Sequence, residues 1–371
     1  MQYFTQTLDI PVKEPTHSDF SEIDAVAKIL LIDIETTGLS PRKSIVYLIG
    51  CACCESEKWI LHQWFAEKES EEIDILKAFL EFAAAYDLFI TFNGAKFDIP
   101  FLRGRLDACE LKDTTLEFGI IDIYRVLKPF RKILKAPSLR QLNVEKLCGF
   151  ERKDILDGLE LINIYKNYTD ISSPSDLSAI LLHNGDDVRG MIYCLKLLCL
   201  GDFETNLDSM TVIKAYSKKF EDFYGNASSE LYMEAELSES LPVQIDTSLD
   251  SCFLHIKENK VRLRVPLYEK ELKYFYSNWR DYYYLPYEDT ALHKSVAEYV
   301  SRSNRIKASA SNCYTKKKGC FLKQWELIAE PCFREAYNGK DFYFEVTDTV
   351  KKDRRLLSSY AIHVMRHIMM L

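Results

Sequence analysis

Apolar residues run together or alternate with polar ones in three short segments near the start of the chain. Their length and their content of β-branched and aromatic residues are typical of strands, and they cover 28–34, 45–54 and 58–65. Only Glu55, Ser56 and Glu57 separate the last two segments, so a turn is expected between them. The pattern therefore predicts a three-stranded antiparallel meander.

Helical spacing follows the meander. Acidic residues after Ser70 favour the first turn of a helix, and apolar residues recur every three or four positions up to Tyr86. A strand at 88–93, a helix at 99–110 and a strand at 119–123 are expected next. Strands joined through a helical crossover pair in parallel, so the sheet is expected to be mixed.

A long helix is expected to close this part of the chain. Ser173 and Pro174 provide an N-cap and a first-turn proline, and Asp176 follows at the third helical position. Residues 177–200 are then apolar over a broad face. The pattern predicts a helix with its capping residue at position 173.

The pattern changes again after Gly201. Residues 211–224 have the spacing of a short amphipathic helix, and from Glu230 onward alternating stretches rich in Tyr, Phe and Val predict strands. A terminal helix is expected at 355–371. A chain of 371 residues exceeds one typical domain, and we expect an N-terminal extension at 1–27, an α/β domain at 28–204 and a β-rich α+β domain at 205–371.

Composition narrows the class of protein. A content of 47% hydrophobic and 28% charged residues is ordinary for a globular chain. The longest apolar runs fall short of the roughly 18 residues that a membrane helix needs, and the N-terminus lacks the pattern of a signal peptide. The 11 cysteines are scattered and predict reduced thiols; a zinc site at Cys313, Cys320 and Cys332 is not favoured by their spacing. We expect a cytoplasmic protein without a membrane partner.

Four carboxylates carry the candidate chemistry. Asp33 and Glu35 lie two positions apart at the end of the first strand and project from the same side of it. Such a pair repels itself unless a positive charge lies between. Asp98 follows the strand at 88–93 and also stands where a helix N-cap is expected. Asp187 lies on the long helix, four residues after His183 and on the same face.

Three motifs bring these residues into a recognisable order. They are Phe92-Asn-Gly-Ala-Lys-Phe-Asp-Ile-Pro-Phe-Leu102, Ser138-Leu-Arg-Gln-Leu142 and His183-Asn-Gly-Asp-Asp-Val188. Together with the acidic pair of the first strand, they resemble the DEDD 3′–5′ exonucleases of the ribonuclease H-like superfamily, and within it the YprB-like family. The resemblance covers roughly residues 28–200 and implies a ribonuclease H-like mixed sheet flanked by helices.

The resemblance also implies a two-metal phosphodiester hydrolysis with Mg²⁺ or Mn²⁺. Asp33 would bridge both ions, Glu35 and Asp187 would hold the ion that activates water, and Asp98 would support the other. His183 would orient or deprotonate the attacking water.

The spacing between histidine and aspartate departs from the better-known subclasses. Exonucleases with a catalytic His usually place it five residues before the last Asp, and those with a four-residue spacing usually use Tyr. Asp186 is a rival to Asp187, which we prefer because it shares the face of His183.

The implied substrate is DNA or RNA, single-stranded or with a free 3′ end. The residues implied for binding the terminal nucleotide are Thr36, Gly38, Asn93, Ser138 and Arg140. A net charge of −8 opposes a polyanion, but 23 Lys and Arg stand against 33 Asp and Glu in residues 1–204, and 25 against 23 in 205–371. Two basic stretches lack acidic residues, one between Asp122 and Glu145 and one at 302–318.

Three functions stay open: an exonuclease, an endonuclease of the same fold, and a binding module that has kept the fold. The presence of all four acids argues against the last. The chain has neither a P-loop nor a nicotinamide-binding fingerprint. The aromatic groups at 274–276 and 282–284 are candidates for base stacking, although clustered aromatic residues more often form a core.

Overall fold

The computed structural model describes residues 1–111, 119–154, 156–221, 225 and 227–370. The chain divides into two compact units, Met1–Glu204 and Thr205–Leu371. The helix α7 (Phe203–Asp208) spans the boundary between the units.

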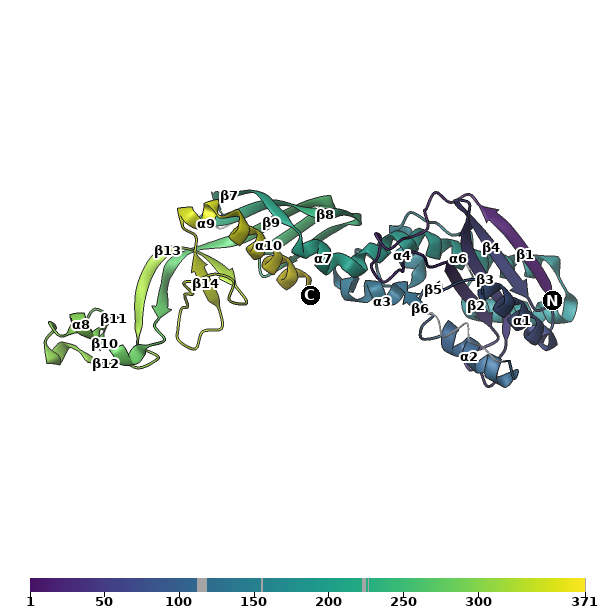
Figure 1. Cartoon of the computed structure of the whole chain (residues 1–371), viewed down its shortest axis with the longest axis horizontal. Coiled ribbons are helices and arrows are strands. Elements are labelled where there is room, and N and C mark those ends of the chain that lie inside the picture. The colour runs from purple at the N-terminus through teal and green to yellow at the C-terminus, as the bar shows by residue number, and fades with distance from the viewer. Residues whose placement is uncertain (112–118, 155, 222–224, 226, 371) are drawn as a thin grey trace. The chain divides into compact units, whose positions relative to one another are not determined.

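The first unit is built on a six-stranded sheet of order β1-β4-β3-β2-β5-β6 (Figure 1). The first four strands in this order pair antiparallel, whereas β5 pairs in parallel with both β2 and β6. The strands are β1 (Gln2–Leu8), β2 (Ile29–Thr36), β3 (Val46–Glu55), β4 (Lys58–Phe65), β5 (Leu88–Thr91) and β6 (Gly119–Asp122). The predicted ribonuclease H-like mixed sheet is confirmed.

The edge strand β1 lies within the segment expected to be an N-terminal extension. It pairs with β4 along its whole length, yet Leu8 is its one buried residue. A strand whose side chains are mostly exposed lacks the apolar pattern on which the sequence prediction rests.

Helices and 3-10 turns connect and cover the sheet. The α-helices are α1 (Glu72–Ala83), α2 (Asp98–Ala108), α3 (Ile123–Leu127), α4 (Gln141–Leu147), α5 (Gly158–Ile171) and α6 (Pro174–Cys194), and the 3-10 turns are η1 (Glu69–Glu71), η3 (Lys128–Lys132) and η4 (Leu195–Asp202). The hydroxyl of Ser173 accepts a hydrogen bond from the amide of Asp176, so the predicted cap of α6 is confirmed. The long helix is shorter than expected, because residues after Cys194 continue as η4.

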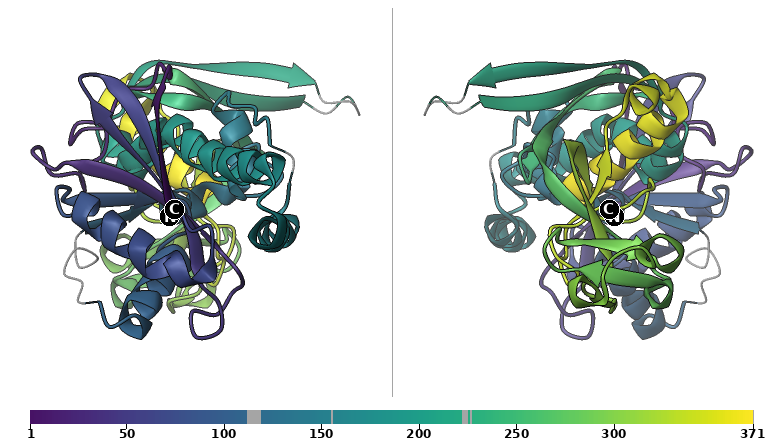
Figure 2. Two further views of the ribbon diagram at one scale, coloured as in Figure 1. Left: turned by 90° about the vertical axis from the view of Figure 1, so that its right-hand side faces the viewer. Right: turned by 90° about the vertical axis from the view of Figure 1, so that its left-hand side faces the viewer.

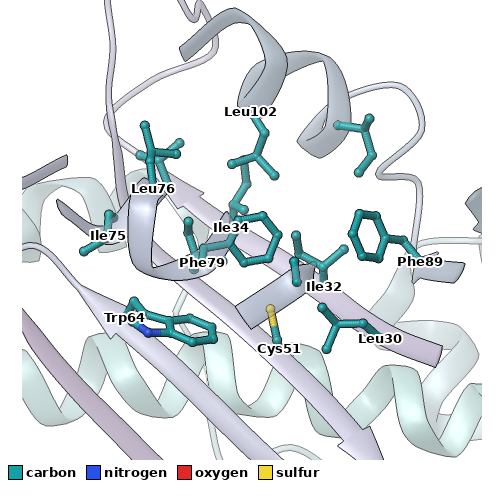
Figure 3. Close-up of a cluster of buried hydrophobic side chains, with 14 of the residues drawn as sticks. Leu30, Ile32, Ile34, Cys51, Trp64, Ile75, Leu76, Phe79, Phe89 and Leu102 are labelled. Carbon is teal, nitrogen blue, oxygen red and sulfur yellow. The ribbon is translucent and has the colours of Figure 1, made fainter. Parts of the chain in front are cut away.

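Alternation along β2 assigns its side chains to two different layers. Leu30, Ile32 and Ile34 pack with α1 and α2 in a core that includes Phe79 and Leu102 (Figure 3). A second core lies between the sheet and the helices α5 and α6. Because neighbouring side chains of a strand point to opposite faces, the odd-numbered acids of β2 face α6.

The second unit is β-rich, as predicted. Its five-stranded sheet has the order β14-β13-β9-β8-β7, and a three-stranded sheet has the order β11-β10-β12. The strands are β7 (Thr211–Glu221), β8 (Ala227–Leu249), β9 (Cys252–Phe275), β10 (Tyr282–Leu285), β11 (Thr290–His293), β12 (Ile306–Lys307), β13 (Tyr314–Gln324) and β14 (Phe342–Glu345). The remaining elements are η5 (Trp279–Asp281), α8 (Lys294–Ala297), η6 (Arg302–Asn304), α9 (Asp348–Lys352) and α10 (Arg354–Met369).

The helix predicted at 211–224 was wrong. Residues 211–221 form β7, which pairs antiparallel with β8, and residues 222–224 lie outside the described residues. Cross-strand contacts decide the conformation here: Tyr216 stacks on Tyr232 with ring centroids 5.4 Å apart. Such tertiary pairing overrides a local spacing that also suits a helix.

The terminal helix α10 packs against β7, β8 and β9 (Figure 2). It begins one residue earlier than predicted, and Leu371 lies outside the described residues. Among the described residues, no helix is long and apolar enough to span a bilayer. All 11 cysteines are free thiols, as expected.

Candidate metal centre

Asp33 lies on β2 and is fixed by a buried amide of α6. Asn184 Nδ2 donates a hydrogen bond of 2.9 Å to Asp33 Oδ2, and Gln63 Nε2 donates one of 2.9 Å to Asn184 Oδ1. Asn184 is fully buried, and a Cβ atom at Gly50 would lie 2.0 Å from its oxygen. The glycine of β3 thus leaves the space in which Asn184 orients Asp33.

His183 connects two sets of acidic groups through its two ring nitrogens. Nδ1 lies 2.7 Å from Asp154 Oδ2, on the side away from the sheet acids. Nε2 lies 3.4 Å from Asp187 Oδ2 and 3.9 Å from Glu35 Oε1. With its side chain 11% exposed, the imidazole is held within the centre rather than on a solvated helix face.

Asp187 is held by the guanidinium of Arg152, a residue that no sequence motif indicated. Arg152 donates from Nη2 to Asp187 Oδ1 at 2.6 Å and pairs with both oxygens of Glu145 at 2.6 and 2.7 Å. Gln141 donates to Glu145 and to the main-chain oxygen of Asp187. Glu145 is fully buried against Gly190, where a Cβ atom would lie 1.8 Å from its Oε1. This network fixes one oxygen of Asp187 and leaves the other facing His183.

Asp186, the rival to Asp187, has a different environment. Its Oδ2 accepts hydrogen bonds from the amides of Lys153 and Asp154, and its Oδ1 pairs with Arg189. Asp186 therefore anchors the segment 152–154, whereas Asp187 faces Glu35. The geometry supports the choice of Asp187.

Asp98 opens α2 but does not cap it. The N-cap position is Phe97, without a side-chain hydrogen bond, so the expected capping role of Asp98 was wrong. Burial and the charges of Asp187 and Asp122 raise the pKa of Asp98 to about 7, although main-chain hydrogen bonds oppose the rise. Because the buried carboxyl of Asp98 does not cap the helix, it is available to bind a metal ion.

The four predicted carboxylates act on one another electrostatically. Burial, followed by the charges of Asp187, Glu35 and Asp98, raises the pKa of Asp33 well above its usual value. Burial and the charges of Asp187, Asp98 and Asp154 do the same for Glu35. The structure therefore brings the four acids together in one region that a cation would stabilise.

Glu35, His183 and Asp187 form a candidate metal site. One ligand atom from each lies within 4.8 Å of the others, and among the described residues this is the group of His, Cys and acidic side chains with that property. Carboxylate oxygens and an imidazole nitrogen are suitable ligands for divalent cations. The residues present fit a divalent ion.

Stability without metal should depend on pH in a definite direction. Well below pH 4 the carboxyls of Asp33, Glu35 and Asp98, whose pKa values are raised in the folded chain, are protonated in both the folded and the unfolded chain. Between about pH 4 and the pKa of Asp98 at about 7, the unfolded chain releases protons that the folded chain keeps. Each such proton lowers the free energy of unfolding by about 1.4 kcal/mol per pH unit. The midpoint of thermal unfolding in chelator should therefore fall over this range.

Mn²⁺ at about a hundred times its Kd should raise the free energy of unfolding by about 2.7 kcal/mol at pH 8. The gain should shrink toward pH 5, where protons compete for the ligands. Thermal melts across pH 5–8, with chelator and then with Mn²⁺, measure both effects. The variant Asp98→Asn should show a flatter pH dependence in chelator. A midpoint that responds neither to pH nor to Mn²⁺ would show that the acids do not form one site.

Three of the residues implied for substrate binding line one cleft. Asn93, Ser138 and Arg140 border a cavity of about 460 Å³, together with Phe92, Tyr124, Arg131, Leu139 and Gln141. Asn93 has a left-handed φ of 62°, and its amide donates to Asp122 Oδ1 at 2.8 Å. Arg131 belongs to the basic stretch predicted after Asp122, so the cleft combines positive charge with aromatic surface.

Thr36 and Gly38 lie elsewhere, at the end of β2. The hydroxyl of Thr36 donates to the carbonyl oxygen of Gly38 at 2.9 Å, which closes a tight turn. Neither residue borders the cleft of Asn93. The role expected for this segment in nucleotide binding belongs to its main chain and stays a prediction.

The basic and aromatic groups of the second unit are largely engaged in its own structure. Lys316 pairs with Asp289 at 2.7 Å, and Lys317 pairs with Glu345 at 2.6 Å. The rings at 276, 282 and 284 pack around a small core of Ala291, Ala308 and Cys313. For these aromatic residues the structure supports a packing role.

Comparison with known proteins gives two sequence matches. Residues 30–199 match the model of a family described as the RNase_H superfamily. A Bacillus subtilis (strain 168) protein, Uncharacterized protein YprB, is 24% identical over 247 residues, which are 65% of this chain and 59% of that protein. The chain is a distant homologue of this protein and spans less than two thirds of its length.

Two solved structures are among those similar to this chain. The family B DNA polymerase from Pyrobaculum calidifontis aligns with a TM-score of 0.39 and 13% identity over 70% of this chain and 35% of the polymerase. E. coli Exonuclease I in complex with a dT13 oligonucleotide aligns with a TM-score of 0.33 and 13% identity over 57% of this chain and 55% of the exonuclease. Scores this low transfer no property to this chain.

Proposed function

We propose that the protein is a metal-dependent nuclease, because residues 30–199 form a ribonuclease H superfamily domain. It hydrolyses phosphodiester bonds of DNA or RNA as a 3′–5′ exonuclease with two Mg²⁺ or Mn²⁺ ions. The observation that carries the proposal is the convergence of four acids: burial and neighbouring charges, that of Asp187 among them, raise the pKa values of Asp33, Glu35 and Asp98.

Each acid has a part that follows from its position. Asp33 lies among the other acids and is oriented by Asn184, so it suits a ligand shared by two ions. Glu35 and Asp187 each have an oxygen within 4 Å of His183 Nε2 and would hold one ion. Asp98, on α2, would support the second. Bound divalent ions supply an activated water and positive charge for the attacking and leaving oxygens.

The cleft lined by Asn93 and Arg140 suits a nucleotide of the substrate. Arg131 and Arg140 offer charge to phosphate groups, and Tyr124 and Phe92 offer rings to a base. Gln141 lines the cleft and also bonds to Asp187 O at 2.7 Å, so the cleft adjoins the acidic centre. A phosphodiester next to a nucleotide held there is close to the metal ligands.

End-labelled linear strands and circular single strands, each as DNA and as RNA, test this function with Mg²⁺ or Mn²⁺. We expect linear strands to shorten from the 3′ end while circles persist. Cleavage of circles would favour an endonuclease of the same fold. Binding of strands without cleavage, with metal bound, would favour the non-catalytic module.

A further inference from the structure

The strands β7, β8 and β9 of the second unit form a sheet with two different faces. The helix α10 packs against all three strands, and its Leu357 borders the same cavity as Leu231 of β8. Leu231 and Met233 are accordingly buried. Their neighbours Tyr232 and Glu234 point to the opposite face and stay partly exposed. We call the face opposite α10 the open face of the sheet.

A groove of about 530 Å³ lies on the open face. Its lining includes three aromatic rings and two guanidinium groups, which belong to Tyr216, Tyr232, Phe253, Arg262 and Arg264. None of them belongs to the aromatic and basic stretches predicted at 274–284 and 302–318. We propose that this groove binds single-stranded nucleic acid, with bases on the rings and phosphates on the cations. The identity of the ligand rests on the proposed function, and the groove adds a second place at which the chain holds its substrate.

The strand register arranges these groups in rows across the sheet. Tyr216 lies opposite Tyr232, which lies opposite Arg264. Lys214 and Lys218 stand two residues to either side of Tyr216 on β7, and their ammonium groups lie 5.0 and 5.5 Å from the centre of its ring. Every base within a nucleic-acid strand likewise has a phosphate on either side. The order of cation, ring and cation along β7 therefore matches the repeat of such a strand.

The rings leave aromatic surface for a base. Tyr216 and Tyr232 are within 11° of parallel, and their centroids are 5.4 Å apart. Parallel rings at this separation are offset, so each covers only part of the other. Phe253 is 39% exposed, and the guanidinium of Arg264 lies 4.1 Å from the centre of its ring. Every base has a face that can stack on such rings, but in a duplex neighbouring pairs cover that face. The rings therefore favour single strands.

Three of the cations are available to phosphates. Lys214, Lys218 and Arg262 are exposed. Among the described residues, the ion pairs of β7, β8 and β9 join other side chains. A phosphate would therefore not have to displace an acidic partner from these three groups.

Three acids lie on or beside the groove, and each has a cationic neighbour. Glu230 lies 3.7 Å from Arg264 Nη1, and Asp246 pairs with His255. Glu234 has a lysine opposite it on β7 and an arginine opposite it on β9. The excess of positive charge is therefore small. We expect stacking to contribute more to the affinity than charge, and the dependence on salt to be modest.

Photocross-linking of the full chain in chelator locates the bound strand without cleaving it. Single strands of DNA and of RNA that carry 5-iodouracil are bound and irradiated, and mass spectrometry identifies the residues that become attached. We expect attachment at Tyr216, Tyr232 or Phe253. Unlabelled single strands should compete, and a duplex of the same sequence should compete poorly. Absence of attachment at these three rings, or equal competition by the duplex, would overturn the proposal.

Substitutions on the open face test the two kinds of contact separately. Tyr216→Leu should weaken binding of a labelled single strand in chelator by about 5- to 150-fold, the range for one lost base stack. Lys214→Gln combined with Lys218→Gln should lower the slope of log affinity against log salt by about 1.4. Lys219→Gln combined with Lys351→Gln is the matched control, because both lysines border the cavity beside α10 on the other side of the sheet.

The control should leave the slope unchanged, and equal slopes for the two double variants would overturn the proposal. If Tyr216→Leu does not fold, the double variant of exposed lysines and the cross-links of the wild-type protein still decide. Attachment at the groove in a protein that cleaves no strand would keep the groove and overturn the nuclease. Cleavage by a protein without this attachment would keep the nuclease and overturn the groove.

Discussion

Asp33→Asn should lower nuclease turnover by at least about a thousandfold while the protein stays folded. The substitution keeps the size of the side chain and its contact with Asn184, but removes the charge expected to be shared by two ions. Several kcal/mol of charge stabilisation depend on those ions, and about 4 kcal/mol corresponds to a factor of a thousand. Turnover of a labelled single strand at saturating Mn²⁺ is the measurement.

The stability of the same variant gives an internal check. Because Asp33 is repelled by Asp187, Glu35 and Asp98, Asp33→Asn should be more stable than wild type in chelator and should respond less to Mn²⁺. Asp107→Asn, an exposed aspartate of α2, serves as the control and should change neither activity nor the midpoint. Near wild-type turnover by Asp33→Asn would refute the two-metal mechanism.

Arg152→Met should destabilise the protein by about 3 to 5 kcal/mol, because removal of one partner leaves a buried charge without compensation. Glu145 is fully buried and Arg152 is 9% exposed, and their two contacts are 2.6 and 2.7 Å long. Methionine keeps much of the volume, so the loss reports charge. Urea unfolding in chelator at pH 8, where protonation of Glu145 gives the least relief, is the appropriate measurement.

Two further variants test whether the lost ion pair causes the loss of stability in Arg152→Met. Arg152→Met combined with Glu145→Gln should recover most of the lost stability, since the fully buried carboxylate of Glu145 is then neutral and the remaining partner, Asp187, is 15% exposed. Arg189→Met removes a neighbouring cation of α6, but its partner Asp186 keeps two main-chain hydrogen bonds, so the cost should be smaller. Equal losses for Arg152→Met and Arg189→Met would argue against a buried ion pair as a support of the centre.

The sheet could be predicted because its strands have one clear period each. Leu30, Ile32 and Ile34 alternate with the acids, and this alternation alone directs the acids away from α1 and α2. The cap of α6 by Ser173 was equally local, whereas the cap expected at Asp98 was wrong. In contrast, β1 has almost no buried side chain, and β7 depends on pairing with β8. Neither feature leaves a periodic trace in the sequence.

The acids of the centre could be predicted for a different reason: they lie in short motifs. Asn184 and Gln141 lie in the same motifs, so their hydrogen-bonding roles were within reach of the sequence. Arg152 and Asp154 lie in a segment without periodicity, and they meet Asp187 and His183 across 35 and 29 positions. Such pairs arise from the fold, and neither periodicity nor a short motif marks them in the sequence.

The hydrogen bond between Asn184 and Asp33 joins residues 151 positions apart. Closing so long a loop is entropically costly, so contacts of this kind form late, after local helices and turns. During synthesis, β2 emerges long before α6, so Asp33 and Glu35 are exposed before Asn184 and Asp187 can complete the centre. A cation that binds this centre would therefore not guide the early steps of folding; it would prolong the lifetime of the folded domain by slowing its unfolding.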